Sequence, residues 1–273
     1  LINKNILKFF NMSFYLILIY NICLIINHSI KIMQERYLGD IHDFQKFIFV
    51  KFLSCAFNQK IGLNWYLVDP KKIGEKEVNK KDGEKRYFLK KDEFKTIDRK
   101  IYDEFFLLKT KKFRNIRTFT KKTHLGQYVS FYNKKIPLHN REKWFNDSLN
   151  FFKEKKIIFL DPDNGLLRNK KSSKISLKYL LVKEIENYLS KKKTIIFTQF
   201  QSFNKKNTHY LKEINNFLSL KKIKINCPVV VNRTSPNTIF ISLSTDKKME
   251  LKLKKNINEY GMIHKKRIKL ITI

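Results

Sequence analysis

The sequence predicts an α/β protein with a doubly wound, mostly parallel sheet into which a lysine-rich region is inserted. Three apolar runs that are bounded by turn residues indicate buried strands at 64–68, 157–160 and 194–197. Amphipathic stretches separate these runs, and this alternation is typical of a parallel sheet with helices on both faces. We therefore expect a single Rossmann-like domain at 33–273, with the insertion at about 70–140.

In the first half of the chain, the first convincing helix begins after Asp40 and extends to about Cys55. Asp40 is a good N-cap residue, and Asp43 lies in the first turn, where an acid suits the helix dipole. The strand at 64–68 then ends at Asp69-Pro70. The other elements expected here are a charged loop at 71–85, a short strand at 87–89, a helix at 96–108 and a strand at 128–132.

In the second half, an amphipathic helix at 141–152 leads into the strand at 157–160. The elements expected after it are helices at 176–189, 208–220 and 246–260, the strand at 194–197, and an antiparallel pair of strands at 228–231 and 238–242. Thr208 is the expected N-cap of the second of these helices, and Gly261 is expected to end the third.

Residues 1–32 form a hydrophobic extension whose apolar run, 14–26, is shorter than the roughly 20 residues that a membrane helix needs. We favour a true start at Met33, and an N-terminal membrane anchor is the alternative. The three cysteines are far apart and show no CxxC spacing, which argues against a zinc site or a disulfide framework and for a reducing compartment. We therefore expect a cytoplasmic protein.

The formal net charge is +34, from 58 Lys and Arg residues against 24 Asp and Glu residues. Such a field favours phosphate-rich partners, so RNA or DNA is the expected partner. An AT-rich genome is the competing explanation, because the chain is also rich in Ile and Asn. The sequence contains no Walker loop, GxSxG or HExxH motif.

The strand at 157–160 is followed directly by Asp161, Pro162, Asp163 and Asn164, which we predict to be the catalytic residues. Proline cannot continue a central strand, and Asn-Gly is a turn pair, so the chain bends sharply here. Ligands of open α/β sheets bind at this carboxyl edge. The alternative is a tight loop in which Asp163 or Asn164 only caps the next turn.

Other polar residues are expected on the same rim, because Asp69 and Gln199 follow the neighbouring strands. The predicted nucleic-acid-binding residues are the nearby cations Arg168, Lys170, Lys171, Lys174, Lys205 and Lys206. Cations around acidic and amide groups suit a polyanionic substrate, in which they bind the phosphates. The alternative is that these lysines only form a solvated rim.

Two motifs carry a resemblance to known proteins. Arg-Tyr-x-Gly-Asp-x-x-Asp-Phe-x-Lys at 36–46 and Phe-Leu-Asp-Pro-Asp-Asn-Gly at 159–165 resemble the motifs of a family of uncharacterised bacterial and phage proteins. More distantly, the layout is similar to that of the adenine-N6 methyltransferases that modify 23S ribosomal RNA. The resemblance implies a class I methyltransferase-like fold and S-adenosylmethionine as the cofactor. By this match, the cofactor-binding residues are Gly39, Asp40, Asp43, Lys46 and Asp69.

The resemblance also implies a role for the loop after the strand at 157–160. In those methyltransferases the Asp side chain and the next carbonyl accept hydrogen bonds from the adenine amino group, so Asp161 would orient a target amine and Pro162 would aim the carbonyl. The chain departs from the pattern at Asp163, which replaces a proline, and at Asn164, which replaces an aromatic residue. A glycine-rich turn after the first strand is also missing.

Two other functions remain open at this stage. Asp161 and Asp163, joined by Asp40 or Glu184, have the oxygen ligands that Mg²⁺ prefers, which would suit a nuclease or phosphoryl-transfer enzyme. A non-catalytic nucleic-acid-binding protein that kept the fold is the third reading.

Overall fold

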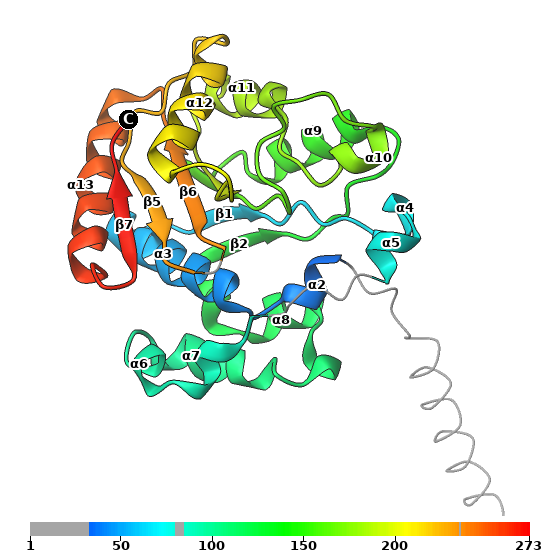
Figure 1. The fold of residues 1–273 in the computed structure, drawn as a ribbon, viewed down its shortest axis with the longest axis vertical. Coiled ribbons are helices and arrows are strands. Elements are labelled where there is room, and N and C mark those ends of the chain that lie inside the picture. The colour runs from blue at the N-terminus through cyan, green and yellow to red at the C-terminus, as the bar shows by residue number, and fades with distance from the viewer. Residues whose placement is uncertain (1–32, 80–84, 235) are drawn as a thin grey trace, which may run out of the picture. The chain divides into compact units, whose positions relative to one another are not determined.

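The computed structural model describes residues 33–79, 85–234 and 236–273, which belong to one compact unit (Figure 1). The predicted N-terminal extension at 1–32 lies outside the described residues. No helix of the described part combines the length and the apolar character needed to cross a membrane.

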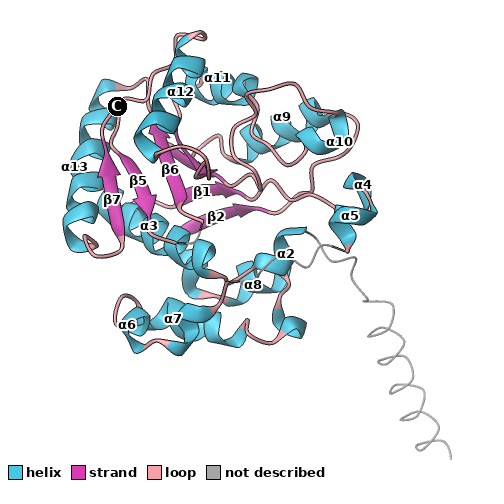
Figure 2. Cartoon of the chain, viewed as in Figure 1, coloured by secondary structure: helices cyan, strands magenta, loops and turns pink. Residues whose placement is uncertain are grey.

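A seven-stranded mixed sheet forms the centre of the molecule (Figure 2). Its strand order is β2-β1-β3-β4-β6-β5-β7. The strands are β1 (Ile61–Asn64), β2 (Val129–Tyr132), β3 (Ile157–Leu160), β4 (Thr194–Phe200), β5 (Val229–Asn232), β6 (Thr238–Leu243) and β7 (Ile268–Ile271). The first four strands pair in parallel, and β6 is antiparallel to both β4 and β5. The prediction of a Rossmann-like α/β fold is confirmed.

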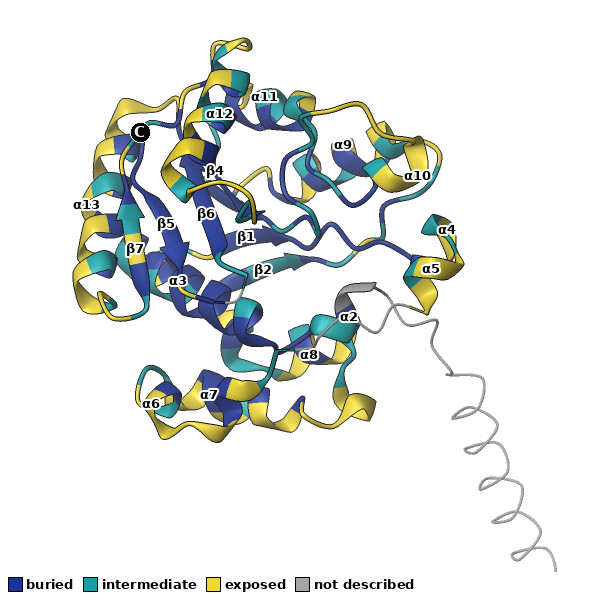
Figure 3. Cartoon of the chain, viewed as in Figure 1, coloured by how far each residue is buried: buried dark blue, intermediate teal, exposed yellow. Residues whose placement is uncertain are grey.

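Helices cover both faces of the sheet, as predicted. One face carries α3 (Ile41–Phe57), α7 (Arg99–Leu107), α8 (Ile116–Lys122) and α13 (Lys247–Ile263). The other face carries α9 (Arg141–Phe151), α11 (Val182–Ser190) and α12 (Asn207–Ser219). Figure 3 shows the strands buried between these layers, while the outer helix faces are exposed.

The alternation of side chains along β3 explains how one short strand serves both cores. Ile157 and Phe159 pack into the core under α3, whereas Ile158 and Leu160 pack into the core under α9, α11 and α12. All four residues are fully buried. A strand that is buried on both faces has no position that faces solvent, so its sequence is a continuous apolar run.

The predicted position of the first strand was wrong. β1 is Ile61–Asn64, not 64–68, and the chain leaves the sheet at Trp65. Tyr66 has a φ of 51°, which interrupts an extended ladder, and its amide donates to the Asn64 side chain at 3.2 Å. The apolar residues 65–68 are buried in the two cores although they belong to no strand.

Other elements differ from the prediction. Residues 87–89 belong to a 3₁₀ helix, η1 (Tyr87–Lys90), and not to a strand. The helix expected at 176–189 is divided into α10 (Ser173–Ser176) and α11. Gly261 lies inside α13 and does not end it, and the N-cap of α12 is Lys206 rather than Thr208. The remaining short helices are α2 (Met33–Tyr37), α4 (Pro70–Ile73), α5 (Glu75–Val78), α6 (Asp92–Lys95), η2 (Lys111–Phe113) and η3 (His124–Gln127).

Candidate functional site

A cavity of about 710 Å³ lies at the carboxyl ends of β1, β3 and β4, next to the N-terminal end of α3. In the sheet, β2 lies on one side of β1 and β3 on the other, so this is the switch point where ligands bind in open α/β folds. The lining residues with carboxyl or amino groups are Asp40, Asp43, Asp161, Asp163, Lys46, Lys85 and Lys178. The volume is that of a small-molecule pocket.

Asp161 presents its carboxylate to this cavity from the end of β3. Its backbone amide still donates to the Asn64 carbonyl at 2.9 Å, and Pro162 then ends the ladder. Lys46 Nζ lies 2.5 Å from Asp161 Oδ2, and Thr198 Oγ1 donates to Oδ1 at 2.7 Å. Burial raises the pKa of Asp161, while Lys46 and these hydrogen bonds oppose the rise. The carboxylate is therefore held in one orientation by two fixed donors.

Lys46 lies between two carboxylates and an aromatic ring. Its ammonium is 2.6 Å from Asp43 Oδ1 and 4.3 Å from the centroid of Trp65, and the side chain is 3% exposed. Burial alone would lower the pKa of Lys46, but Asp161 and Asp43 together raise it above its ordinary value. Lys46 is consequently a permanent cation inside the site.

The predicted residues Gly39, Asp40 and Asp43 form the start of α3. Asp40 Oδ1 accepts from the amides of His42 at 2.9 Å and Asp43 at 3.1 Å, as expected for an N-cap. Asp43 Oδ2 accepts from the Gly39 amide at 2.9 Å. Burial and then the charge of Asp43 raise the pKa of Asp40 to about 8. This cap holds Asp43 in the position from which it contacts Lys46.

His42 is a lining residue that the sequence analysis did not identify as a site residue. Its Nδ1 shares a hydrogen bond with Thr238 Oγ1 at the start of β6, and its ring meets Phe200 edge to face, with centroids 5.7 Å apart. Burial is the largest cause that lowers the pKa of His42 to about 4, and Lys85 and Lys46 lower it further. The imidazole is neutral at physiological pH.

We expect the imidazole signal of His42 in NMR spectra to titrate with a midpoint near pH 4, against about 6.5 for a histidine in an unfolded peptide. Because the folded-state pKa is depressed, the neutral ring contributes stability above pH 6.5, and this stability is lost as the pH falls toward 4. His42→Gln should therefore reduce the acid sensitivity of unfolding. A midpoint near 6.5 in the folded protein would contradict this assignment.

Gln199 on β4 holds the loop after Asp161 through a side-chain hydrogen bond to its backbone. Gln199 Oε1 accepts from the Leu166 amide at 2.8 Å, and Nε2 donates to the Tyr210 hydroxyl at 2.8 Å. Gly165 lies directly over the Gln199 side chain with a φ of 76°. Gln199, expected on the rim, thus lines the cavity and also fixes the loop that carries the predicted catalytic residues.

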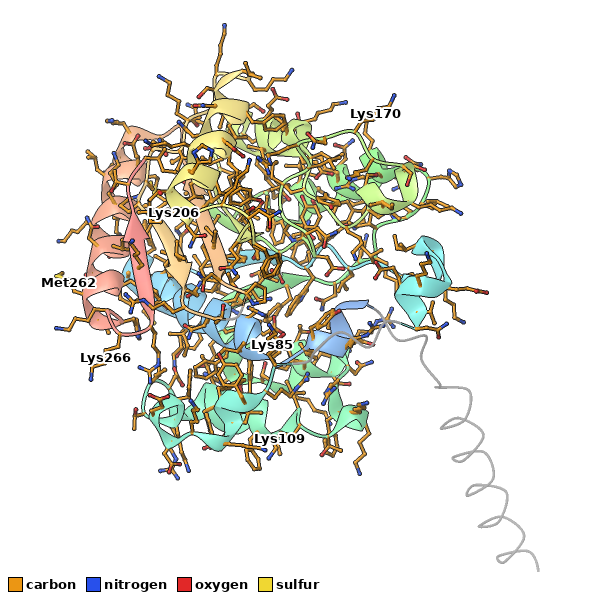
Figure 4. All side chains as sticks on the ribbon, in the orientation of Figure 1. Lys85, Lys109, Lys170, Lys206, Met262 and Lys266 are labelled. Carbon is orange, nitrogen blue, oxygen red and sulfur yellow. The ribbon has the colours of Figure 1, made fainter. Side chains whose placement is uncertain are left out.

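Asp69 and the predicted phosphate-binding cations do not line the cavity. Asp69 caps α4 by accepting from the Lys71 amide at 3.1 Å and lies 3.6 Å from Lys135 Nζ. Arg168 and Lys205 both contact Glu213 on α12, at 3.5 and 2.5 Å. The other predicted cations, Lys170, Lys171, Lys174 and Lys206, are exposed. In Figure 4, Lys170 lies near α10 and Lys206 lies beside α12.

Two of the cavity's lysines were missed by the sequence analysis as site residues. Lys85 adjoins the start of α3, because its carbonyl accepts from the Ile41 amide at 2.9 Å. Lys178 is buried and lies 2.9 Å from Glu77 on α5. Nothing in the sequence near Lys85 or Lys178 distinguishes them from the chain's many other lysines.

The magnesium alternative finds little support in this geometry. Among the residues described, no group of three or more acidic, histidine or cysteine side chains is arranged to hold a metal ion. The ammonium of Lys46 already pairs with Asp161, one of the two predicted magnesium ligands, and with Asp43. Glu184 is engaged elsewhere, since Arg141 Nε lies 2.8 Å from its carboxylate.

The residues after β1 do not fit the glycine-rich cradle through which the resembled methyltransferases hold S-adenosylmethionine. The chain leaves β1 through Trp65 and Tyr66, both fully buried, and the next glycine is Gly74. The ammonium of Lys46 covers the Trp65 ring. A ligand therefore cannot approach the backbone here as closely as a glycine turn allows.

Comparison of the chain with protein-family models, curated protein sequences and solved structures finds no match.

Proposed function

We propose that the protein binds nucleic acid and holds a base that carries an exocyclic amino group against Asp161. The observation that carries this proposal is the Asp161 carboxylate at the switch-point cavity, where Lys46 and Thr198 fix its orientation. Each carboxylate oxygen can accept two hydrogen bonds. The side chain is 15% exposed, so acceptor capacity is left for a donor that enters from the cavity.

The walls of the cavity suit a base better than they suit a bare phosphate or a metal. Apart from the exposed Phe203, its ring-bearing lining residues are Tyr37, His42, Trp65, Tyr179, Phe200, Tyr210 and Phe240. Aromatic rings stack on bases, and the net charge of +34 attracts the phosphate backbone. Because the cavity has the volume of a small-molecule pocket, a base must leave its stack to enter it.

Methyl transfer from S-adenosylmethionine is the reaction that the resemblance implies. The fold is compatible with this proposal, since the parallel strands β1, β3 and β4 end at the cavity that holds Asp161. The absence of a fitting glycine cradle after β1 limits the proposal to recognition of the base. Calorimetric titration with S-adenosylmethionine tests the extension to methyl transfer, and heat of binding would support it.

We expect AMP to bind more tightly than IMP, and CMP more tightly than UMP, because only the first of each pair has an exocyclic amine that can donate to Asp161. A well-placed base contact of this kind contributes about 1–3 kcal/mol of discrimination, or roughly 5- to 150-fold in Kd. Isothermal titration calorimetry measures the four affinities.

Asp161→Asn provides the control for this experiment. The amide can present either a donor or an acceptor to the cavity, so the preference for AMP over IMP should fall toward unity while the fold is kept. Equal affinities of the unmodified protein for AMP and IMP would refute recognition of the amine by Asp161.

A further inference from the structure

Phe203 is the most exposed aromatic residue among the residues described, at 81%. It lies in the loop between β4 and α12, and it also lines the mouth of the switch-point cavity. Leaving a phenylalanine side chain in water forgoes roughly 1.5–3 kcal/mol of burial. Among the described residues no ring stacks on Phe203, whereas Phe200, three residues earlier, is in contact with His42.

The loop that carries Phe203 is also basic. Lys205 and Lys206 follow Phe203 after Asn204, and both are exposed. Lys205 lies 2.5 Å from Glu213 and is partly neutralised by it. Lys206 forms no ion pair with any described residue, and Figure 4 shows its position beside α12. An exposed ring next to an uncompensated ammonium matches the way proteins bind single-stranded nucleic acid, with bases on aromatic rings and phosphates on cations.

We propose that Phe203 is the stacking platform for the nucleotide that flanks the base in the cavity, and that Lys206 contacts the phosphate of that nucleotide. This inference rests on the proposed function and names its substrate class, which is an unpaired stretch of nucleic acid. Phe203 stands at the mouth and not in the interior of the cavity, so it meets the neighbouring base and not the one held at Asp161.

The test compares a mononucleotide with a single-stranded oligonucleotide. Binding of a fluorescein-labelled oligoadenylate of about ten nucleotides is followed by fluorescence anisotropy, and AMP binding is followed by calorimetry. Phe203→Ala should weaken oligonucleotide binding by roughly 5- to 150-fold, the value of one base–ring stack, and should leave AMP affinity unchanged. Phe203→Trp should restore tight binding. Leu220→Ala, at an 80% exposed residue after α12, is the matched control and should change neither affinity.

Lys206→Gln probes the phosphate contact separately. It should lower the slope of log Kd against log salt concentration by about 0.7, the value for one phosphate contact on a single strand, while Phe203→Ala should leave the slope as it is. The inference is overturned if Phe203→Ala leaves oligonucleotide affinity intact, or if it weakens AMP and oligonucleotide binding equally. Failure of the proposed function has a different signature, namely equal binding of AMP and IMP by the unmodified protein.

Discussion

Replacing Lys46 with methionine is expected to lower the free energy of unfolding by about 3–5 kcal/mol at neutral pH. Methionine fills a similar volume, so the loss is electrostatic. Asp161 and Asp43, which lie 2.5 and 2.6 Å from the ammonium, would remain buried without a partner cation. Without Lys46 the pKa of Asp161 rises further, so the carboxyl takes up a proton as the pH falls. The cost of the substitution should therefore shrink in acid.

Urea denaturation at pH 7 and pH 5 measures this loss, and Lys51→Met on the same helix is the matched control. Lys51 lies 2.5 Å from Asp98, but its side chain is 24% exposed, so solvent compensates for much of the lost pair. We expect a loss of only about 1 kcal/mol there. Similar losses for the two variants would show that Lys46 is not the buried counter-ion of Asp161.

The part of the site that could be predicted from the sequence is the part that is local in the chain. An apolar quartet before Asp-Pro-Asp-Asn-Gly indicates a buried strand with a kinked tip, and β3 ends as expected at Leu160. The N-cap at Asp40 is likewise determined by residues 40–43 alone, because its side chain accepts from the amides of His42 and Asp43. Such features depend on steric limits and hydrogen bonds of neighbouring residues, and these act wherever the segment is placed.

The part that could not be predicted depends on contacts between distant segments. Lys46 and Asp161 are separated by 115 positions, and His42 and Thr238 by 196. The position of β1 was predicted wrongly because residues 65–68 are as apolar as a buried strand. They are buried by tertiary packing outside the sheet. Because lysine is so frequent in this chain, the sequence alone does not indicate which lysines line the cavity.

Lys46 pairs with two of the cavity's carboxyl groups at once. The Lys46 cation, held by Asp43 and Asp161, balances part of their charge from within the protein. The arrangement keeps one acceptor, Asp161, in a fixed orientation before any ligand arrives. Preorganisation of this kind reduces the ordering cost of binding, which would favour the proposed recognition of a base.

Gly165→Ala is expected to destabilise the protein by about 2–6 kcal/mol and to displace the loop that carries Asp161. A Cβ at this position would lie 2.2 Å from Gln199 Oε1, and the φ of 76° is unfavourable for any residue with a side chain. The backbone strain contributes roughly 1–3 kcal/mol and the overpacking a similar amount. Gln199 cannot move away freely, because it holds Leu166 and Tyr210 by hydrogen bonds of 2.8 Å each.

Thermal and urea denaturation measure the effect, and Gly126→Ala is the control, because a Cβ there would meet only the Thr120 carbonyl at 3.9 Å. The double variant Gly165→Ala/Gln199→Ala separates the two causes. Removal of the Gln199 side chain relieves the clash but not the backbone strain, so the double variant should be less destabilised than the sum of the single variants. Simple additivity would show that the close approach of Gly165 to Gln199 does not determine the shape of this loop. A loss of the preference for AMP over IMP in Gly165→Ala alone would link the loop's shape to the orientation of Asp161.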